Sequence, residues 1–229
     1  NPNNYFTAQG LDNRANDLTN LLDSMSTAIN TIQAANNGIS AITKLVQSAQ
    51  SLVSQAQQTS DTTVRASLAT QFDSIRTQID KLAGDSGFNG INLLNGDNLT
   101  VTMNETGTSS VTVSGVTDTS ASALAVNAST NNWAAASDIS TASSQLTSAL
   151  TTLRSQSQTL GSSLSTVQIR QDFTKATINT LQTGSSDLTL ADSNQEGANL
   201  LALQTRQQLS TTALSLASQA DQNVLRLFQ

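Results

Sequence analysis

Residues 196–228 read EGANLLALQTRQQLSTTALSLASQADQNVLRLF, and this stretch carries the pattern that decides the fold. On a helical period it shows two neighbouring apolar stripes, and Gly197 is its only glycine. A helix that packs along its own domain needs one stripe, so two stripes predict neighbours on more than one side. We therefore expect an assembly element whose interface side chains are Leu200, Leu201, Leu203, Leu209, Leu214, Leu216, Val224, Leu225, Leu227 and Phe228.

The composition excludes several kinds of chemistry. The 229 residues include no cysteine and no histidine, which excludes thiolate and imidazole metal sites, cysteine redox chemistry and histidine-dependent triads. A formal net charge of −6 argues against nucleic-acid binding. No apolar run approaches the roughly 20 residues that a membrane-spanning helix needs, so no membrane insertion is expected. The carboxylates are scattered over helical patterns, and we predict no enzyme activity, cofactor or metal site.

Apolar residues at alternating steps of four and three predict three helices before the terminal one. The first covers about residues 7–57, with a phase change or gentle bend at Gly38. The second covers about 61–83 with Ser60 or Asp61 as its N-cap, and Gly84 ends it. The third covers about 138–184 and ends at the Gly184-Ser185-Ser186-Asp187 break. The predicted apolar seams include Leu45, Leu52, Val64, Leu68, Phe72, Leu146 and Leu153.

The middle of the sequence has a different pattern. Glycines and Asn-Gly pairs in residues 84–96 predict a structural corner, because these pairs favour positive φ and no Lys-Ser/Thr of a phosphate loop follows. Period-two alternation then predicts a β-hairpin at about 98–116. Trp133 is open to two interpretations, core packing or ligand stacking, and packing is the commoner role.

These elements predict a mainly α fold. We expect a long antiparallel helical rod, a coiled-coil-like bundle, with a small β-hairpin at or along one end. Residues 1–187 are the predicted rod-like domain, and residues 188–229 are the predicted terminal helix.

Three motifs together resemble a known family. Residues 1–15 form an entry into a long helix, Phe88-Asn89-Gly90 forms a structural turn, and residues 196–209 open the terminal helix. In these motifs the chain resembles a bacterial flagellin of the alphaproteobacterial kind. The resemblance implies a structural subunit of the flagellar filament that self-assembles through its terminal helices for motility. It also implies that residues 188–228 are half of a terminal coiled coil.

The same resemblance implies a location and partners. The subunit would be extracellular, exported without a cleaved signal peptide through the flagellar type III apparatus. Besides other copies of itself, its partners would be an export chaperone that binds the C-terminal helix, the filament cap and the hook-junction proteins. The family's N-terminal segment does not occur in this sequence, which implies a truncated or processed product that cannot build a normal filament. Residues 97–136 leave room for a thin outer face only.

The resemblance also extends to an immune-recognition motif. Many flagellins present Leu-Gln-Arg-Val-Arg-Glu-Leu on the first long helix to a vertebrate receptor. The matching stretch here runs from Ile39 to Leu45, and neither arginine is present. Lys44 stands in place of the acid, which reverses a charge. We expect poor receptor activation from these degenerate positions, Ile39, Ile42, Thr43, Lys44 and Leu45.

Three other functions remain open. A hook–filament junction protein shares the helical ends, although the uninterrupted motif from Ala198 to Leu209 favours a flagellin. A flagellin-like surface adhesin that binds polysaccharide would be expected to carry aromatic-rich outer loops, and Trp133 alone supports it. A type III translocator normally contains a hydrophobic membrane-inserting stretch, which this sequence lacks.

Overall fold

The computed structural model describes residues 2–117, 119–190 and 193–227. In the last helix it describes the side chains of residues 196–223. The chain divides into two compact units, Asp12–Leu181 and a second that joins Asn1–Leu11 to Gln182–Gln229. We call them the bundle unit and the terminal unit, and each is described by itself.

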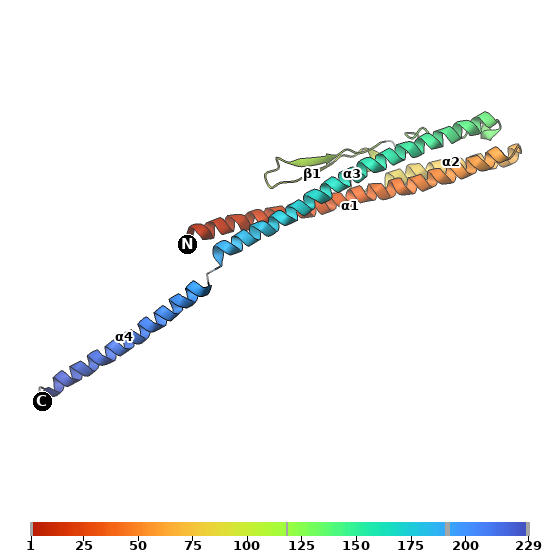
Figure 1. The fold of residues 1–229 in the computed structure, drawn as a ribbon. Helices are drawn as coiled ribbons and strands as arrows, with labels where there is room; N and C mark the ends of the chain where they lie inside the picture. Colours follow the sequence, from red (N-terminus) through yellow and green to blue (C-terminus); the bar gives the residue numbers. More distant parts are fainter. Residues whose placement is uncertain (1, 118, 191–192, 228–229) are drawn as a thin grey trace. The chain divides into compact units, whose positions relative to one another are not determined.

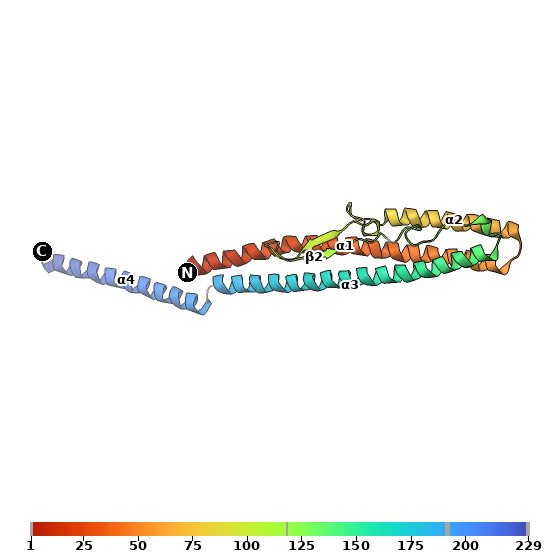
Figure 2. The ribbon, with the colours of Figure 1, turned by 90° about the horizontal axis from the view of Figure 1, so that it is seen from above.

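Three helices build the bundle unit: parts of α1 (Pro2–Gln58) and α3 (Ala136–Thr189), and the whole of α2 (Thr62–Asp85). Figures 1 and 2 show α1 and α3 side by side, with α2 beside the C-terminal part of α1. Helices α2 and α3 both run antiparallel to α1. Gln171, late in α3, donates a hydrogen bond of 2.9 Å to Ser26, early in α1. At the other end of the bundle, Arg65 at the start of α2 donates to the carbonyl of Ala134, just before α3. The part of α1 in this unit has 47 residues, or about 70 Å at 1.5 Å per residue.

The apolar seams predicted from the sequence form the core of this unit. Its most buried large side chains come from all three helices, from the corner between α2 and the hairpin, and from the segment just before α3. They include Met25, Ile32, Ile42, Phe72, Ile79, Leu93, Trp133, Ile139, Leu146, Leu153 and Leu160, each 0% exposed. The predicted fold class is therefore confirmed.

In the second half of α1, the buried apolar stripe is wider than the sequence spacing predicted. Leu45 and Leu52 were expected at its centre, but they are half-buried. Val46 and Val53 take the central positions, at 0% and 1% exposure. The reason is that α1 lies between α2 and α3 here, so it buries two adjoining stripes. In α2, Val64 is 45% exposed, contrary to the prediction, because it lies in the first turn at the tip of the bundle.

Helix ends follow from local hydrogen bonds. Asp61 is the N-cap of α2, and its Oδ1 accepts from the backbone N–H groups of Thr63 (2.8 Å) and Val64 (3.3 Å). At the other end α2 continues past Gly84 to Asp85, and Ser86 is the C-cap. The hydroxyl of Ser86 donates to the carbonyl of Leu82 at 2.6 Å.

Gly38 allows close packing against the corner that follows α2. The helix α1 continues through this position without interruption. A Cβ atom at residue 38 would lie 2.7 Å from Cβ of Ser86 and 2.8 Å from Cδ1 of Leu94. The buried residues Ala35, Ile39, Ile42 and Val46 keep one four-three spacing past Gly38, so the predicted phase change is wrong. The glycine permits contact with residues about 50 positions further along the chain.

The corner itself is a chain of turns. Phe88 and Ile91 exchange two backbone hydrogen bonds of 2.8 and 3.0 Å around Asn89 (φ 50°) and Gly90 (φ 80°). Both residues have positive φ, as a tight hairpin turn requires. Asn92 then connects the corner to α2, since its Nδ2 donates to the carbonyls of Ala83 and Gly84, both at 2.9 Å.

The hairpin consists of β1 (Leu99–Thr102) and β2 (Ser110–Val113), paired antiparallel from Leu99 with Val113 to Thr102 with Ser110. It lies along the bundle (Figure 1), with its tip beside the early part of α1. The guanidinium of Arg14 donates to Oε1 of Glu105 at this tip. A backbone hydrogen bond lowers the pKa of Glu105, and Arg14 lowers it further. Of the two predicted placements, the structure thus has the hairpin along the bundle.

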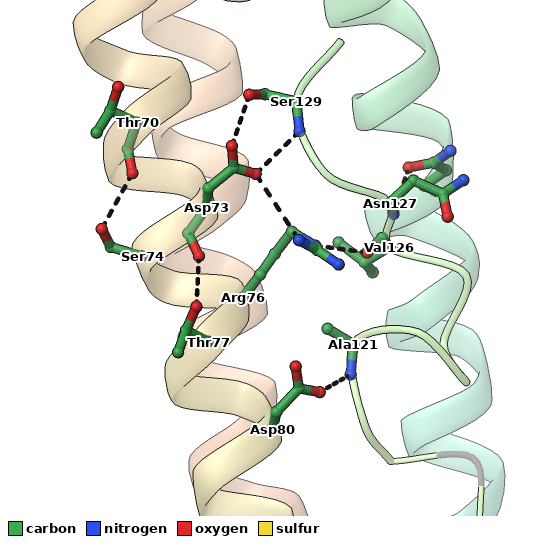
Figure 3. Close-up of polar contacts among 11 residues, drawn as sticks. Thr70, Asp73, Ser74, Arg76, Thr77, Asp80, Ala121, Val126, Asn127 and Ser129 are labelled. Atoms are coloured by element: carbon green, nitrogen blue, oxygen red, sulfur yellow. Dashed lines mark hydrogen bonds and ion pairs between the residues drawn. The ribbon is translucent and has the colours of Figure 1, made fainter.

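The segment from 119 to 135 returns from the hairpin to the start of α3, and α2 holds it in place (Figure 3). Oδ1 of Asp80 accepts from the N–H of Ala121 at 2.8 Å. Asp73 accepts from the N–H and the hydroxyl of Ser129 at 2.9 and 2.7 Å. Nε of Arg76 donates to the carbonyl of Val126 at 2.7 Å. These three residues of α2 bind the segment mainly through its backbone.

Trp133 closes this segment. Its φ of 60° is unusual for a bulky residue, but its ring is fully buried and lies 5.0 Å from the ring of Phe72 between centroids. The packing interpretation is confirmed. Because the ring is inaccessible, it is not available to stack on a sugar, and the adhesin hypothesis loses the residue on which it rested.

In the terminal unit, α3 continues through the predicted break at Gly184 to Thr189, so that prediction is wrong. A Cβ at residue 184 would be in ordinary contact with Leu11, and the hydroxyl of Ser185 donates to the carbonyl of Ala8 at 3.3 Å. Packing against the first residues of α1 therefore keeps these residues helical. The last helix, α4 (Ser193–Leu227), belongs to the same unit.

Gly38→Ala should lower the free energy of unfolding by about 1–3 kcal/mol, because the new methyl group overpacks the contact with Ser86 and Leu94. Gly161→Ala is the matched control, since Gly161 lies inside α3 and an added Cβ there would have nothing within 4 Å. It should stabilise by up to about 1 kcal/mol through helix propensity. Urea denaturation followed by circular dichroism measures both, and equal effects of the two substitutions would contradict the packing role of Gly38.

Asp73→Ala should destabilise the bundle by about 1–2 kcal/mol, because two donors of Ser129 lose a charged acceptor. The same urea titration provides the measurement. Asp23→Ala, at an exposed position of α1, is the control and should change stability by less than about 0.5 kcal/mol. If Asp73→Ala and Ser129→Ala proved fully additive in the double variant, the contact would not contribute.

Candidate assembly surface

The described side chains of α4 are all exposed. From Glu196 to Asn223 no residue is buried or half-buried within the chain. The described part of α4 contains six leucines of the predicted interface, and their exposed fractions range from 55% to 74%. They are Leu200, Leu201, Leu203, Leu209, Leu214 and Leu216.

The same spacing of apolar residues is buried elsewhere in the molecule. In α1, Leu18, Met25 and Ile32 follow one another at steps of seven and are 4%, 0% and 0% exposed. On α4, Leu209 and Leu216 are also seven apart and remain 64% and 61% exposed. Full burial of each leucine would stabilise an assembly by about 1.5–3 kcal/mol. The surface of α4 is thus suited to packing against other helices.

Local interactions of α4 are weak by comparison. The hydroxyl groups of Thr205 and Thr212 donate hydrogen bonds to the carbonyls of Leu201 and Gln208, at 2.7 and 2.8 Å. Glu196 lies in the first turn, where a negative charge stabilises a helix by a few tenths of a kcal/mol. Helices in proteins owe most of their stability to tertiary packing. We therefore expect α4 to gain stability when another chain covers it.

Four predicted interface residues lack a described environment. The side chains of Val224, Leu225 and Leu227 lie outside the described side chains, and Phe228 lies outside the described residues altogether.

The receptor-motif positions are split between the core and the surface. Ile39 and Ile42 are buried at 2% and 0% exposure, so they serve the bundle core. Thr43 and Leu45 are half-buried, and Lys44 is exposed. The Phe88-Asn89-Gly90 turn lies at the corner, with Phe88 39% exposed.

Two exposed residues of α3 were missed by sequence reasoning. Ile169 and Phe173 are 66% and 62% exposed, on the part of α3 that lies in the bundle unit. The sequence does contain a sign of their exposure. Both residues lie between the seam residues Val167 and Ile178 but on a different face of the helix. They form a second exposed apolar patch, one turn of helix apart.

Other kinds of site find little support. Among the described residues, acidic side chains do not gather in groups of three or more that could hold a metal ion. In the same part of the chain, none of the helices has the length and apolar character to cross a membrane.

Comparison with known families identifies both ends of the chain. The bacterial flagellin N-terminal helical region matches residues 2–99, and the bacterial flagellin C-terminal helical region matches residues 143–228. The helical bundle and the exposed apolar helix define a mainly α-helical structural protein. The chain belongs to the bacterial flagellin family.

Individual relatives agree with this family. Flagellin A of Rhizobium meliloti (strain 1021) is 42% identical over 81 residues, which cover 35% of this chain and 21% of that protein. The flagellin of Brucella melitensis is 31% identical over 157 residues, which cover 63% of this chain and 55% of the relative. In these comparisons the chain spans about a fifth of the first relative and about half of the second. A crystal structure of Bacillus cereus flagellin is 17% identical, with a TM-score of 0.48, covering 79% of this chain and 94% of that one.

Proposed function

We propose that this chain is a structural subunit of the bacterial flagellar filament and assembles with other copies through α4. The observation that carries the proposal is the exposure of six leucines along one helix, each at least 55% exposed. Solvent-exposed apolar stripes of this length mark interaction surfaces in soluble proteins. The family matches at both ends of the chain support the same function.

The proposal includes a division of labour along the chain. The part of the chain predicted as the rod-like domain, residues 1–187, would form the core of the subunit, and α4, in the predicted terminal part 188–229, would join subunits. The interface comprises the ten apolar residues predicted on that helix. The subunit acts outside the cell as part of the filament, and its role is structural.

The finer partners follow from the same helix. Before assembly, exposed leucines would promote aggregation inside the cell. An export chaperone that covers the C-terminal helix would prevent this, and export through the flagellar type III apparatus would deliver the chain to the filament tip. The filament cap would contact the subunit there, and the hook-junction proteins are further proposed partners.

Replacing Leu209 and Leu216 by Ser should raise the concentration needed for polymerisation by roughly a hundredfold or more, because burial of two leucines is lost. Sedimentation and electron microscopy measure the assemblies that the purified chain forms, which need not be normal filaments. Gln207→Ser with Gln219→Ser is the matched control, since it introduces the same residue at exposed polar positions of α4. Polymer from the double leucine variant at the wild-type concentration would refute assembly through α4.

We also propose that the receptor-motif positions make this chain a weak activator of the vertebrate receptor. Ala41 and Thr43 are half-buried and Lys44 is exposed, so new side chains there reach the surface. Ala41→Arg, Thr43→Arg and Lys44→Glu together should raise the response of reporter cells at least tenfold above the parent. A tenfold gain in receptor affinity corresponds to roughly 1.4 kcal/mol of binding free energy. The bundle must keep its melting temperature as a control. A parent that already matches an arginine-containing flagellin would end this proposal.

A further inference from the structure

Three Asn-Gly pairs occur in the sequence, and the fold gives each of them a different backbone conformation. Asn37-Gly38 lies inside α1. Asn95-Gly96 lies at the end of η1 (Leu93–Asn95), a short 3-10 helix of the corner, and Asn89-Gly90 forms the tip of the turn between Phe88 and Ile91. All three asparagine side chains are exposed. Differences in reactivity among the pairs therefore depend on the backbone and on the packing of the glycine.

An Asn-Gly pair is able to modify itself with water as the only other reactant. The backbone nitrogen of the glycine attacks Cγ of the asparagine and forms a new C–N bond. The bond from Cγ to Nδ2 breaks, and Nδ2 leaves as ammonia with the proton of the glycine nitrogen. Glycine favours this step, because it has no side chain to shield the nitrogen and its backbone rotates freely.

Water then opens the cyclic imide that this step forms. Cleavage between the imide nitrogen and Cγ gives aspartate. Cleavage between the nitrogen and the main-chain carbonyl carbon gives isoaspartate, in which the backbone runs through the side chain. The net reaction consumes water, releases ammonia and involves no oxidation or reduction, so the chain needs no cofactor for it.

The helix α1 opposes ring closure at Asn37. Helical geometry fixes ψ of this residue near about −42°, and the N–H of Gly38 is hydrogen-bonded within the helix. Ser86 and Leu94 of the corner also pack closely on Gly38. The glycine nitrogen therefore reaches Cγ of Asn37 only after local unfolding of α1, next to the buried Ile39.

The pair Asn89-Gly90 meets none of these obstacles. Both residues lie in an exposed turn, outside the helices and strands. Among the residues that the structure describes, the hydrogen bonds found at this turn join Phe88 to Ile91 and do not use the N–H of Gly90 or the side chain of Asn89. A Cβ at residue 90 would have nothing within 4 Å, so the space around the glycine is open. Rotation of this turn costs only two surface hydrogen bonds.

The pair Asn95-Gly96 is intermediate. Gly96 has a φ of 90° and lies outside a regular helix, but a Cβ there would lie 2.8 Å from Cγ2 of Thr117. The N–H of Asn95 also donates to the carbonyl of Asn92 at 3.0 Å. This pair is thus held more firmly than the turn at residue 89, although less firmly than the helix at residue 37.

We propose that Asn89 is a modification site, which deamidates in the folded protein to isoaspartate and aspartate ahead of Asn95 and Asn37. The reaction takes water as its substrate and releases ammonia. The proposal is independent of assembly through α4, because every residue that it uses lies in the bundle unit.

The products change the corner in two ways. Isoaspartate adds a carbon to the backbone of a tight turn, which is incompatible with the paired hydrogen bonds of 2.8 and 3.0 Å between Phe88 and Ile91. Both products carry a new carboxylate. Residue 89 lines a cavity between α1 and the hairpin together with Glu105, whose ion-pair partner is Arg14. The new carboxylate adds a second negative charge to this cavity, and like charges repel.

Peptide mapping by mass spectrometry tests the proposal. The full chain is incubated in neutral buffer, and the aspartate and isoaspartate at residues 37, 89 and 95 are followed with time. An unincubated sample corrects for deamidation during digestion. Asn89 should react at least roughly tenfold faster than Asn37, since a local opening that costs ~1.4 kcal/mol already slows a reaction tenfold. Asn95 should fall between them, and a rate at Asn89 no higher than at Asn37 or Asn95 would overturn the proposal.

The same incubation in urea is the matched control. Unfolding removes the helix around Asn37 and the packing around Gly96, so the three pairs should then react at similar rates. If the folded and unfolded chains gave the same order and ratio of rates, neighbouring residues in the sequence would decide the reactivity, and the structural explanation would be wrong.

Hydrogen exchange tests the effect on the turn. Asn89→Asp carries the new charge on a normal backbone, so it separates the effect of charge from that of the longer chain. The amide of Ile91 should exchange faster in the isoaspartate form than in Asn89→Asp, because only the former loses the paired hydrogen bonds. Equal exchange in the two forms would refute the effect on the turn. Loss of polymer in the leucine variants of α4 would leave all of these results unchanged.

Discussion

The structure depends on the burial of α1 between its two neighbours in the bundle unit. The chain has few aromatic and few strongly apolar residues, so each helix offers only a narrow apolar seam. Such a seam is stable only when a partner helix lies along its whole length. Antiparallel packing of α1 against both α2 and α3 supplies that partner, and it buries Met25, Ile42 and Val53 almost completely. The bundle unit is therefore long because its seams are narrow.

This constraint also explains the small features of the unit. Gly38 brings the corner into contact with α1, and Asp73, Arg76 and Asp80 hold the returning segment on α2. Without these contacts the segment from 119 to 135 would have few apolar residues to fix it, apart from Trp133 and its neighbours in the core. In α4 the same kind of seam has no cover among the described residues. The physical chemistry that builds the bundle unit within one chain thus favours association of α4 with other chains.

Much of the fold was predictable because it depends on local spacing. Periodicity located α1, α2, α3 and the hairpin, and the side chain of Asp61 has the predicted capping bonds. The errors have tertiary causes. Gly38 predicted a phase change or bend because its close neighbours Ser86 and Leu94 are distant in sequence, and α3 passes Gly184 because Ala8 and Leu11 pack there. The leucines of α4 were found from their double stripe, whereas Ile169 and Phe173 were missed because a pair is too short to show a period.

The most direct test of the central claim is hydrogen exchange at the backbone amides of α4, measured in dilute protein and in polymer. The protected amides of Met25 to Val53 in α1 serve as the internal reference. The account predicts that amides from residue 196 to 223 exchange far faster than this reference in dilute protein and become protected in the polymer. Protection equal to that of α1 already in dilute protein, or continued fast exchange in the polymer, would contradict it.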